Sequence, residues 1–348
     1  MELVKEKVVY QGIVARKYSY LLMFAALGLV SLLVDVLVGP AWLSVPDVIK
    51  TIFGVGTVEA TTEVIVWTLR LPTALMAIVV GATLGIAGAE MQTILDNPLA
   101  SPYTLGISSG AGFGAALAMV IGGGKLPIPE AYLVPSSAFV FALLTCLLIY
   151  FIGRARAMTA ETMVLAGIGL MFLFHALLAL LQYMASPEAL QAIVFWLFGS
   201  LMKATWPKVG LVSAVLVLAI PMIVKDAWKL TALKLGDEKA KSLGINVERL
   251  RLKTFVLISL LTASAVCFVG TIGFIGLVGP HIARMIVGED QRFFLPLSAL
   301  GGALLLSVAS IGSKLIIPGA IFPIGIVTSL IGVPFFFSLI LMQKREYW

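Results

Sequence analysis

Long runs of apolar residues recur along the whole chain, and they constrain the fold more than any other feature. Of the 348 residues, 60% are hydrophobic and only 12% carry a charge, whereas soluble domains carry roughly 25% charged residues. A helix needs about 20 mostly apolar residues to cross a bilayer, so this apolar content suffices for roughly ten crossings. The sequence therefore predicts an all-α, polytopic membrane protein consisting of one transmembrane domain, residues 1–348.

Ten apolar segments fit this expectation. We expect transmembrane helices at residues 18–38, 66–91, 106–121, 132–152, 161–184, 209–224, 254–276, 277–288, 294–315 and 322–341. The eighth segment is too short to cross a bilayer alone. The first is long enough to span and is followed by no small-residue cleavage pattern, which predicts a retained helix rather than a signal peptide.

Basic residues between the predicted spans indicate an orientation. They occur in the loop 153–156, in the segment 225–253, which holds eight of them, and at Lys344-Arg345. Cytoplasmic loops carry an excess of Lys and Arg. We therefore expect a protein of the cytoplasmic membrane with both termini in the cytoplasm, a cytoplasmic segment 1–17 and a cytoplasmic loop 225–253. The net charge of +6 follows from this pattern and does not indicate nucleic-acid binding.

Glycine spacing predicts where helices pack closely. Small residues four apart form one helix face and let backbones approach in a membrane. Two glycine-rich runs also lead to polar loops, 96–98 and 288–290, which predicts a weak inverted repeat with a transport pathway at its interface; shared membrane-helix composition is the alternative explanation. The candidate packing and pathway residues are Gly81, Gly85, Gly88, Asn97, Pro98, Gly106, Ser109, Gly110, Gly114, Gly273, Gly276 and Pro280.

Groups that could perform chemistry are few. His175 and His281 lie in separate predicted spans with no fixed relation to a carboxylate, and His175 reads as a helix-packing residue. Asp35 and Glu90 are carboxylates within apolar stretches, where such groups are functional hypotheses by default, although Glu90 could reach water at its helix end. The two cysteines fit neither a metal-site spacing nor a disulfide framework. We expect no catalytic, cofactor or metal site, and an energy source on another chain.

The most polar element between spans is the segment Leu233–Gly244. Asp237 and Glu238 suit the positive end of a short helix, Lys239 and Lys241 suit its far end, and Gly244 can terminate it. This pattern predicts a short helix near 234–244. A solvated loop is one interpretation, and a helix that docks on a partner protein is the other.

Several longer motifs occur in a fixed order. They are Arg70-Leu71-Pro72, GAEMQTILDNPLASPYTLGISSGAG at 88–112, WLFGS at 196–200, LGDEKAKSLGI at 235–245, GFIGLVGPHIAR at 273–284, FPIGI at 322–326 and GVP at 332–334. With them, the chain resembles the FecCD family of ABC-importer permeases, over nearly all of its length after the first span. The joint, ordered occurrence of these motifs is highly specific, whereas any one alone is not.

The resemblance implies an ABC type II importer permease that works as a homodimer. Two cytoplasmic ATPase subunits would bind ATP and Mg²⁺, and an extracytoplasmic binding protein would deliver the solute. Arg70 and Lys314 match basic positions that contact that binding protein, although Thr73 stands where relatives often have a second Arg. The residues implied to couple to the ATPase are Leu235, Gly236, Asp237, Glu238, Ala240, Leu243 and Gly244.

The resemblance also bounds the solute. Members of the family import metal chelates, among them ferric siderophores, haem and cobalamin, and some import oxyanions. A ferric siderophore is our first expectation, with the other three as alternatives. A secondary carrier and a polytopic membrane enzyme are further alternatives from other classes, and each would need a richer set of intramembrane carboxylates or histidines.

Overall fold

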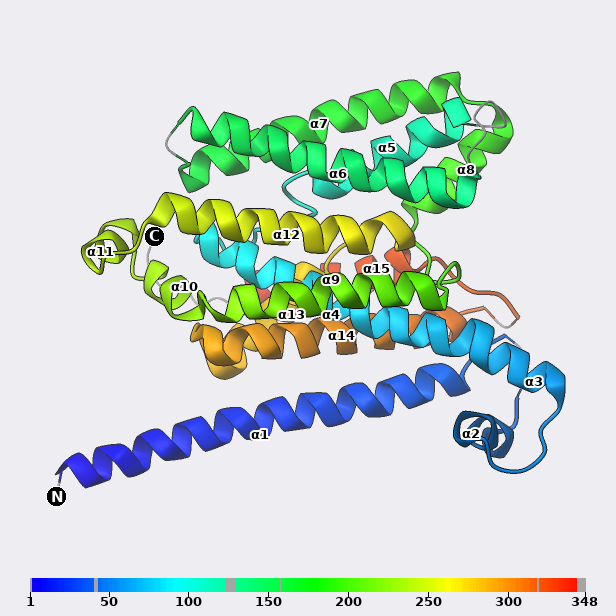
Figure 1. The fold of residues 1–348 in the computed structure, drawn as a ribbon, viewed down its shortest axis with the longest axis horizontal. Coiled ribbons are helices and arrows are strands. Elements are labelled where there is room, and N and C mark those ends of the chain that lie inside the picture. The colour runs from blue at the N-terminus through cyan, green and yellow to red at the C-terminus, as the bar shows by residue number, and fades with distance from the viewer. Residues whose placement is uncertain (1, 41–42, 123–128, 157, 318, 343–348) are drawn as a thin grey trace.

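The computed structural model describes residues 2–40, 43–122, 129–156, 158–317 and 319–342, and within these ranges the chain is helical without strands (Figure 1). The helices are α1 (Glu2–Leu37), α2 (Val45–Phe53), α3 (Ala60–Val64), the π-helical η1 (Ile65–Arg70), α4 (Leu71–Ile94), α5 (Ile107–Gly122), α6 (Glu130–Arg154), α7 (Ala160–Met184), α8 (Pro187–Leu197), α9 (Trp206–Val224), α10 (Ala227–Leu233), α11 (Asp237–Ser242), α12 (Val247–Val269), α13 (Ile275–Val287), α14 (Gln291–Leu315) and α15 (Ile324–Met342).

Seven helical stretches in the described part of the chain are long and apolar enough to cross a membrane. They are Tyr10–Leu37, Ala60–Ile94 (which joins α3, η1 and α4), Glu130–Arg154, Ala160–Met184, Trp206–Val224, Val247–Val269 and Gln291–Leu315. Together with the shorter apolar helices α5, α13 and α15, they coincide with the ten predicted segments. The prediction of an all-α, polytopic membrane protein is confirmed. Lys344 and Arg345, used to predict the orientation, lie outside the described residues.

The structure differs from the predicted segments at one helix end and in one additional helix. The seventh segment was expected to continue to residue 276, but α12 ends at Val269, where Gly270 adopts φ +77° and the chain becomes non-helical until α13. The helix α8 was not predicted, because it is too short to register as a span. Its start is nevertheless marked in the sequence: Ser186 caps the helix by accepting a hydrogen bond from the Ala189 N–H, and Pro187 stands in the first turn.

The predicted inverted orientation of the two glycine runs is wrong. Gly276 of α13 lies against Leu84 and Gly88 of α4, and further along Arg284 of α13 donates a hydrogen bond to Gln92 of α4. Residue numbers therefore rise in the same direction along both helices, so α13 and α4 are parallel. The physical reason is the break after Val269: the chain reverses there, so α13 runs opposite to α12.

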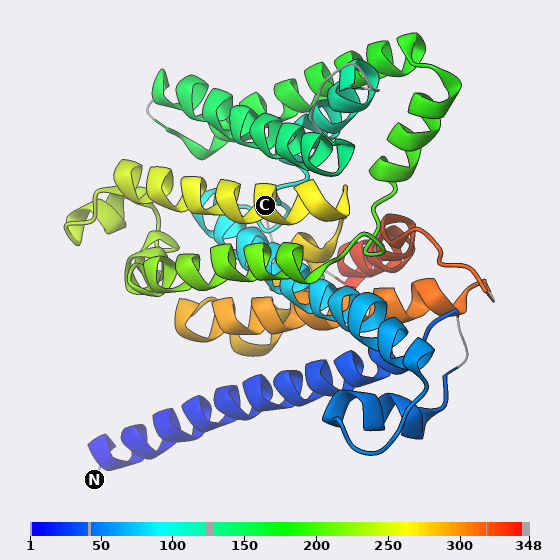
Figure 2. The same cartoon turned by 45° about the vertical axis from the view of Figure 1, so that its right-hand side comes forward.

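The helices form layers around α4. Helix α4 contacts α12, α13 and α14, and α1 packs along the outer side of α14. On the opposite side, α5, α6, α7 and α8 form a separate layer that meets the core through α12 (Figures 1 and 2). Helices α10 and α11 lie at the end of the molecule where α1 begins, and α2 and α3 lie at the other end.

Backbone contact holds α4 to α13 and α14. A Cβ atom added to Gly88 would overlap the carbonyl group of Gly276, and one added to Gly81 would overlap that of Gly302. Gly85 is in the same kind of contact with α14. Lipid gives helices no hydrophobic reason to associate, so this closeness depends on the missing side chains. We call this line of contacts the glycine seam.

Replacing Gly88 by Ala should therefore separate α4 from α13. Inserting a methyl group into a packed contact typically costs about 1–3 kcal/mol, and here the obstacle is backbone, which cannot rotate away. We expect a lower melting temperature for the purified protein in detergent. Gly169→Ala in α7 is the matched control, because a Cβ there meets nothing within 4 Å. Equal melting temperatures for Gly88→Ala and the parent would contradict the seam.

Candidate functional site

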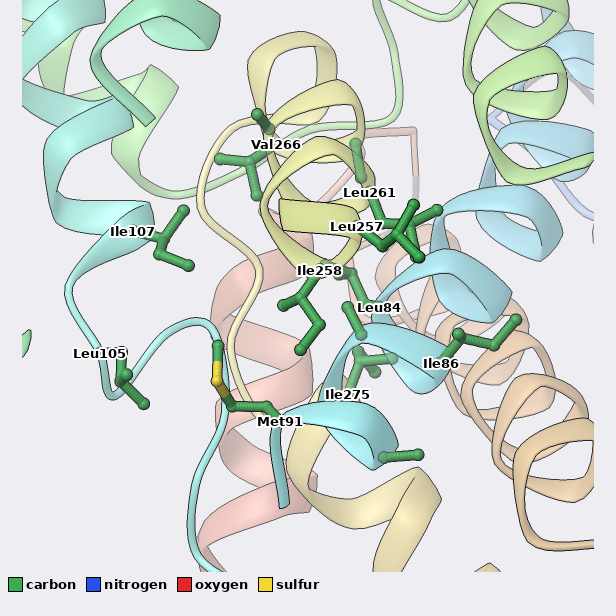
Figure 3. Packing of buried hydrophobic residues seen from close by; sticks show 14 of the residues in the cluster. Leu84, Ile86, Met91, Leu105, Ile107, Leu257, Ile258, Leu261, Val266 and Ile275 are labelled. Atoms are coloured by element: carbon green, nitrogen blue, oxygen red, sulfur yellow. The ribbon is translucent and has the colours of Figure 1, made fainter. Parts of the chain in front are cut away.

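Helix α13 begins inside the bundle rather than at its end. Its second residue, Gly276, lies beside Leu84 and Gly88 of α4, well before the end of α4 at Ile94. Figure 3 shows Ile275 at this start together with Leu84 of α4 and Ile258 of α12. The non-helical residues 270–274 lead into it. Helices interrupted at membrane depth are a recurring construction at transport sites, where other parts of the protein satisfy the freed backbone groups.

Three breaks in the helices meet at this point. The Ser200 N–H donates to the carbonyl of Val269 at 2.7 Å, the Thr271 hydroxyl donates to the carbonyl of Leu197, and the Gly325 N–H donates to the carbonyl of Phe198 at 2.9 Å. Two backbone hydrogen bonds and one from a threonine hydroxyl thus join the turn after α8 to the segment after α12 and to the start of α15. We call residues 197–200, 270–275 and 323–325 the broken-helix centre.

Glycine at position 199 is required by this arrangement. Gly199 adopts φ +73°, which L-residues with side chains rarely adopt. A Cβ atom there would also lie 2.8 Å from the carbonyl oxygen of Thr271. The WLFGS motif thus has a structural meaning: its glycine allows the α8 turn to approach the break in α12.

The second helix that starts inside the bundle is α5. Leu105 and Gly106, just before it, pack against Gly167 and Met171 in the interior of α7. The polar loop before them turns at Asp96, which has φ +45°, and the Asn97 side chain accepts a hydrogen bond from the Leu99 N–H. Pro98 follows in the same turn.

This loop reaches the broken-helix centre through one residue. The ring of Tyr103 lies 3.9 Å from the position a Cβ would take on Gly273. The loop 95–106 and the break at 270–274 therefore meet. Two of the motifs that are far apart in sequence, at 88–112 and 273–284, converge here.

The remaining predicted packing residues lie at close helix contacts. In α5, a Cβ on Gly114 would lie 2.6 Å from the Ser137 carbonyl oxygen of α6, and one on Gly110 would overlap the Thr145 hydroxyl. Within α13, Pro280 is buried. Because Pro has no N–H, the carbonyl of Gly276 lacks its helical donor, and this is the carbonyl that faces Gly88.

Ser109 and His175 form a hydrogen bond across two helices. The Ser109 hydroxyl of α5 and Nε2 of His175 in α7 are 3.0 Å apart, and the His175 side chain lies on an exposed face. His175 thus contributes to the contact between α5 and α7, although its side chain is not enclosed there. An imidazole exposed in the middle of an apolar helix is costly in hydrocarbon.

Glu90 is buried, contrary to the expectation that it could reach water. Its residue exposure is 0%, and neither carboxyl oxygen has a hydrogen-bond partner among the described residues. Such groups mark sites of interest in membrane proteins. In the part of the chain that the structure describes, no group of three or more His, Cys, Asp or Glu side chains is placed to hold a metal ion.

The helix predicted near 234–244 is α11, which is shorter and covers Asp237–Ser242. The short helix α10, which was not predicted, precedes it, and together they form the segment 227–244. Gly236 and Gly244, on either side of α11, both have positive φ angles, +98° and +80°. Ala240 faces inward and is buried, whereas Leu235 and Leu243 are 58% and 52% exposed. Together with Trp228 of α10, which is 64% exposed, they present three large apolar side chains to the surroundings, beside the exposed carboxylate of Glu238.

Asp226 fixes the start of this segment. It is buried between α9 and α10, where Lys229 donates to it at 2.7 Å and Lys253 of α12 forms a second ion pair. Burial alone would raise the pKa of its carboxyl group, but the two lysines outweigh burial and hold the pKa below its usual value. The start of α10 is therefore held by charge on both sides.

Arg70 and Lys314 are not the exposed cations expected at an outer surface. Arg70 is buried and donates to the carbonyls of Val36 and Leu37. Lys314 is 8% exposed and forms an ion pair with Asp35 at 2.8 Å. Their contact with a binding protein stays a prediction, and it would require these interactions to open.

The sequence motifs and this geometry agree with a comparison against known proteins. The model of the FecCD transport family matches residues 26–342. The chain belongs to the FecCD transport family. The resemblance inferred from the motifs is confirmed, and the protein is an integral membrane permease of the ABC-importer type.

Relatives of this FecCD protein transport different solutes. It is 36% identical over 328 residues to the Fe(3+)-citrate import system permease protein YfmE of Bacillus subtilis, covering 94% of this chain and 96% of that protein. It is 37% identical over 272 residues to the vitamin B12 import system permease protein BtuC of Vibrio cholerae, covering 78% and 81%.

A solved structure extends the similarity to the fold. A transporter of metal-chelate type, in an inward-facing conformation, matches with a TM-score of 0.81 at 31% identity, covering 92% of this chain and 98% of that one.

Some residues of this FecCD permease were not singled out from its sequence. The sequence marks Asp35 only as an intramembrane carboxylate and does not reveal its partner Lys314. Ser310 also donates a hydrogen bond to Asp35, at 2.9 Å. In the sequence, Arg251 is one of the basic residues of the loop 225–253 and nothing sets it apart from them. The apolar setting of Asp35 was a usable signal, because a buried carboxylate requires a cation.

The Asp35–Lys314 pair should behave as a unit in the FecCD permease. Removing one partner of a buried ion pair costs about 3–5 kcal/mol because the other charge stays uncompensated, whereas replacing both is often neutral. We expect Lys314→Met to lower the melting temperature strongly and Asp35→Leu/Lys314→Met to recover most of the loss. If the double variant is less stable than Lys314→Met alone, the two side chains do not compensate each other.

Proposed function

We propose that this FecCD permease imports a ferric siderophore, driven by ATP hydrolysis on a separate partner chain. Support comes from the ferric citrate permease, which matches over nearly the full length of both chains. The vitamin B12 relative keeps cobalamin as the main alternative, with haem and oxyanions behind it. The broken-helix centre and the exposed Ser109–His175 pair are the candidate pathway elements.

The proposal assigns ATP and Mg²⁺ to the partner and no cofactor to this chain. Its docking element is the segment α10–α11, where Leu235 and Leu243 expose apolar surface that a partner could cover. Two ATPase subunits on a homodimer would dock on the two copies of this segment. Because the segment is rich in basic residues, it would lie in the cytoplasm.

The proposal also assigns a delivering protein to the opposite end of the molecule. The two termini would then be cytoplasmic, and α2 and α3 would face the outside. A binding protein carries most of the solute specificity in such a system, which is why the permease alone does not select one chelate.

Uptake into proteoliposomes tests the solute. The permease would be reconstituted with its ATPase and binding protein, and uptake of a ferric siderophore, cyanocobalamin and haem would be compared. We expect uptake of the ferric siderophore that requires ATP. Uptake of cobalamin alone would transfer the proposal to the alternative solute, and uptake without ATP would contradict the ABC mechanism.

The docking element is tested by adding charge to its apolar surface. Leu235→Glu/Leu243→Glu should abolish co-purification of the ATPase subunit, because a carboxylate buried at an interface without a partner is strongly disfavoured. The control is Phe53→Glu/Val55→Glu, which changes two exposed apolar residues at the other end of the molecule. That variant should keep the ATPase. Normal co-purification with the first variant would place the docking surface elsewhere.

A further inference from the structure

Arg251 connects the docking segment to the core of the bundle. It stands near the start of α12 and is only 6% exposed. Its two terminal nitrogens donate to the two carboxylate oxygens of Asp237, the first residue of α11, at 2.7 and 2.9 Å. Its Nε donates to the carbonyl of Ile94, the last residue of α4, at 2.8 Å. One guanidinium group therefore joins α11 and α4.

These three contacts need the guanidinium shape. A planar fork can bind both oxygens of a carboxylate and still donate from Nε, whereas a lysine ammonium is a point charge and lacks that geometry. The Ile94 carbonyl belongs to the last turn of α4, where helical carbonyls lack intrahelical donors. Arg251 thus donates hydrogen bonds to the last carbonyl of α4 and to the Asp237 carboxylate at the same time.

A second connection ends on the same part of α4. Lys234, between α10 and α11, pairs with Asp96 just after α4 and with Glu289 at 3.4 Å. Glu289 in turn lies 3.3 Å from Arg284, which donates to Gln92 of α4 at 2.8 Å. Both connections from the docking segment therefore reach residues 92–96.

The position of α4 makes this end important. Through the glycine seam, the backbone of α4 touches those of α13 and α14. Packed backbones have no side chains between them that could adjust to a displacement. A shift of the α4 end therefore moves the start of α13, which forms part of the broken-helix centre.

We propose that Arg251 is a positioning residue that transmits movement of the docking segment to α4. The proposal rests on the proposed function, in which α10–α11 docks on the ATPase. When that segment moves, the fork on Asp237 and the bond to Ile94 carry α4 with it, and the glycine seam carries α13. The ion pairs of Lys234 act in parallel on the same helix end.

The test separates assembly from coupling. In Arg251→Lys the charge remains but the fork and the Ile94 contact cannot both form. We expect the permease–ATPase complex to assemble and hydrolyse ATP, while solute uptake per ATP falls about tenfold, within the range of typical coupling energies. Arg292→Lys is the matched control, because it makes the same substitution near the same end of the bundle. Arg292 is exposed, and its ion-pair partner Asp290 is a near neighbour in the sequence rather than a residue of a distant helix. This variant should leave coupling within about twofold of the parent.

Asp237→Asn provides a second variant on the other side of the contact. It should also lower uptake per ATP, and the double variant Asp237→Asn/Arg251→Lys should be little worse than either single variant, because both act through one contact. Additive losses would overturn the proposal.

The remaining outcomes each decide the proposal as well. Parental uptake per ATP in Arg251→Lys would overturn the connection. Loss of ATPase assembly in this variant would also overturn it, because Arg251 would then only shape the docking surface. Failure of the unmodified permease to bind the ATPase would instead refute the proposed function, and the connection with it.

Discussion

Contact between helix backbones along the glycine seam is the constraint on which the rest of the bundle depends. Gly81, Gly85 and Gly88 remove the side chains that would hold α4 away from α13 and α14. With α14 placed this closely, Lys314 lies where Asp35 of α1 can pair with it, so the outermost helix is anchored as well. The contact between Gly88 and Gly276 also places the start of α13 inside the bundle. The chain has to turn back after α12 to reach that start, which is why the helix breaks after Val269.

Hydropathy and residue spacing were enough to predict the main helices, because the membrane imposes a simple rule on length and polarity. The charged helix near 237 and the close glycine contacts follow rules that are equally local. The direction of α13 was not predictable in this way. It depends on the reversal after Val269, which is marked only by Gly270, one of 33 glycines in the chain.

The candidate site was less predictable, because its polar groups have partners that are distant in sequence. Hydropathy marked Asp35 as a carboxylate in an apolar setting, but it gave no sign that its partner is Lys314, which is 279 residues away. Arg251 is a similar case. Among the eight basic residues of the loop 225–253 it is distinguished by binding both Asp237 and Ile94, and the Ile94 contact exists only after α4 and α12 have packed.

The bundle combines close backbone contacts, which resist displacement of one helix against another, with hydrogen bonds that can break and form again. The glycine seam has no side chains to adjust, so α4, α13 and α14 should move together. The broken-helix centre is different, since two backbone hydrogen bonds and one from the Thr271 hydroxyl hold the segments at 197–200, 270–275 and 323–325. Each such bond contributes only about 0.5–1.5 kcal/mol net. A shape change driven from one end of α4 would therefore be absorbed at these breaks rather than within the seam.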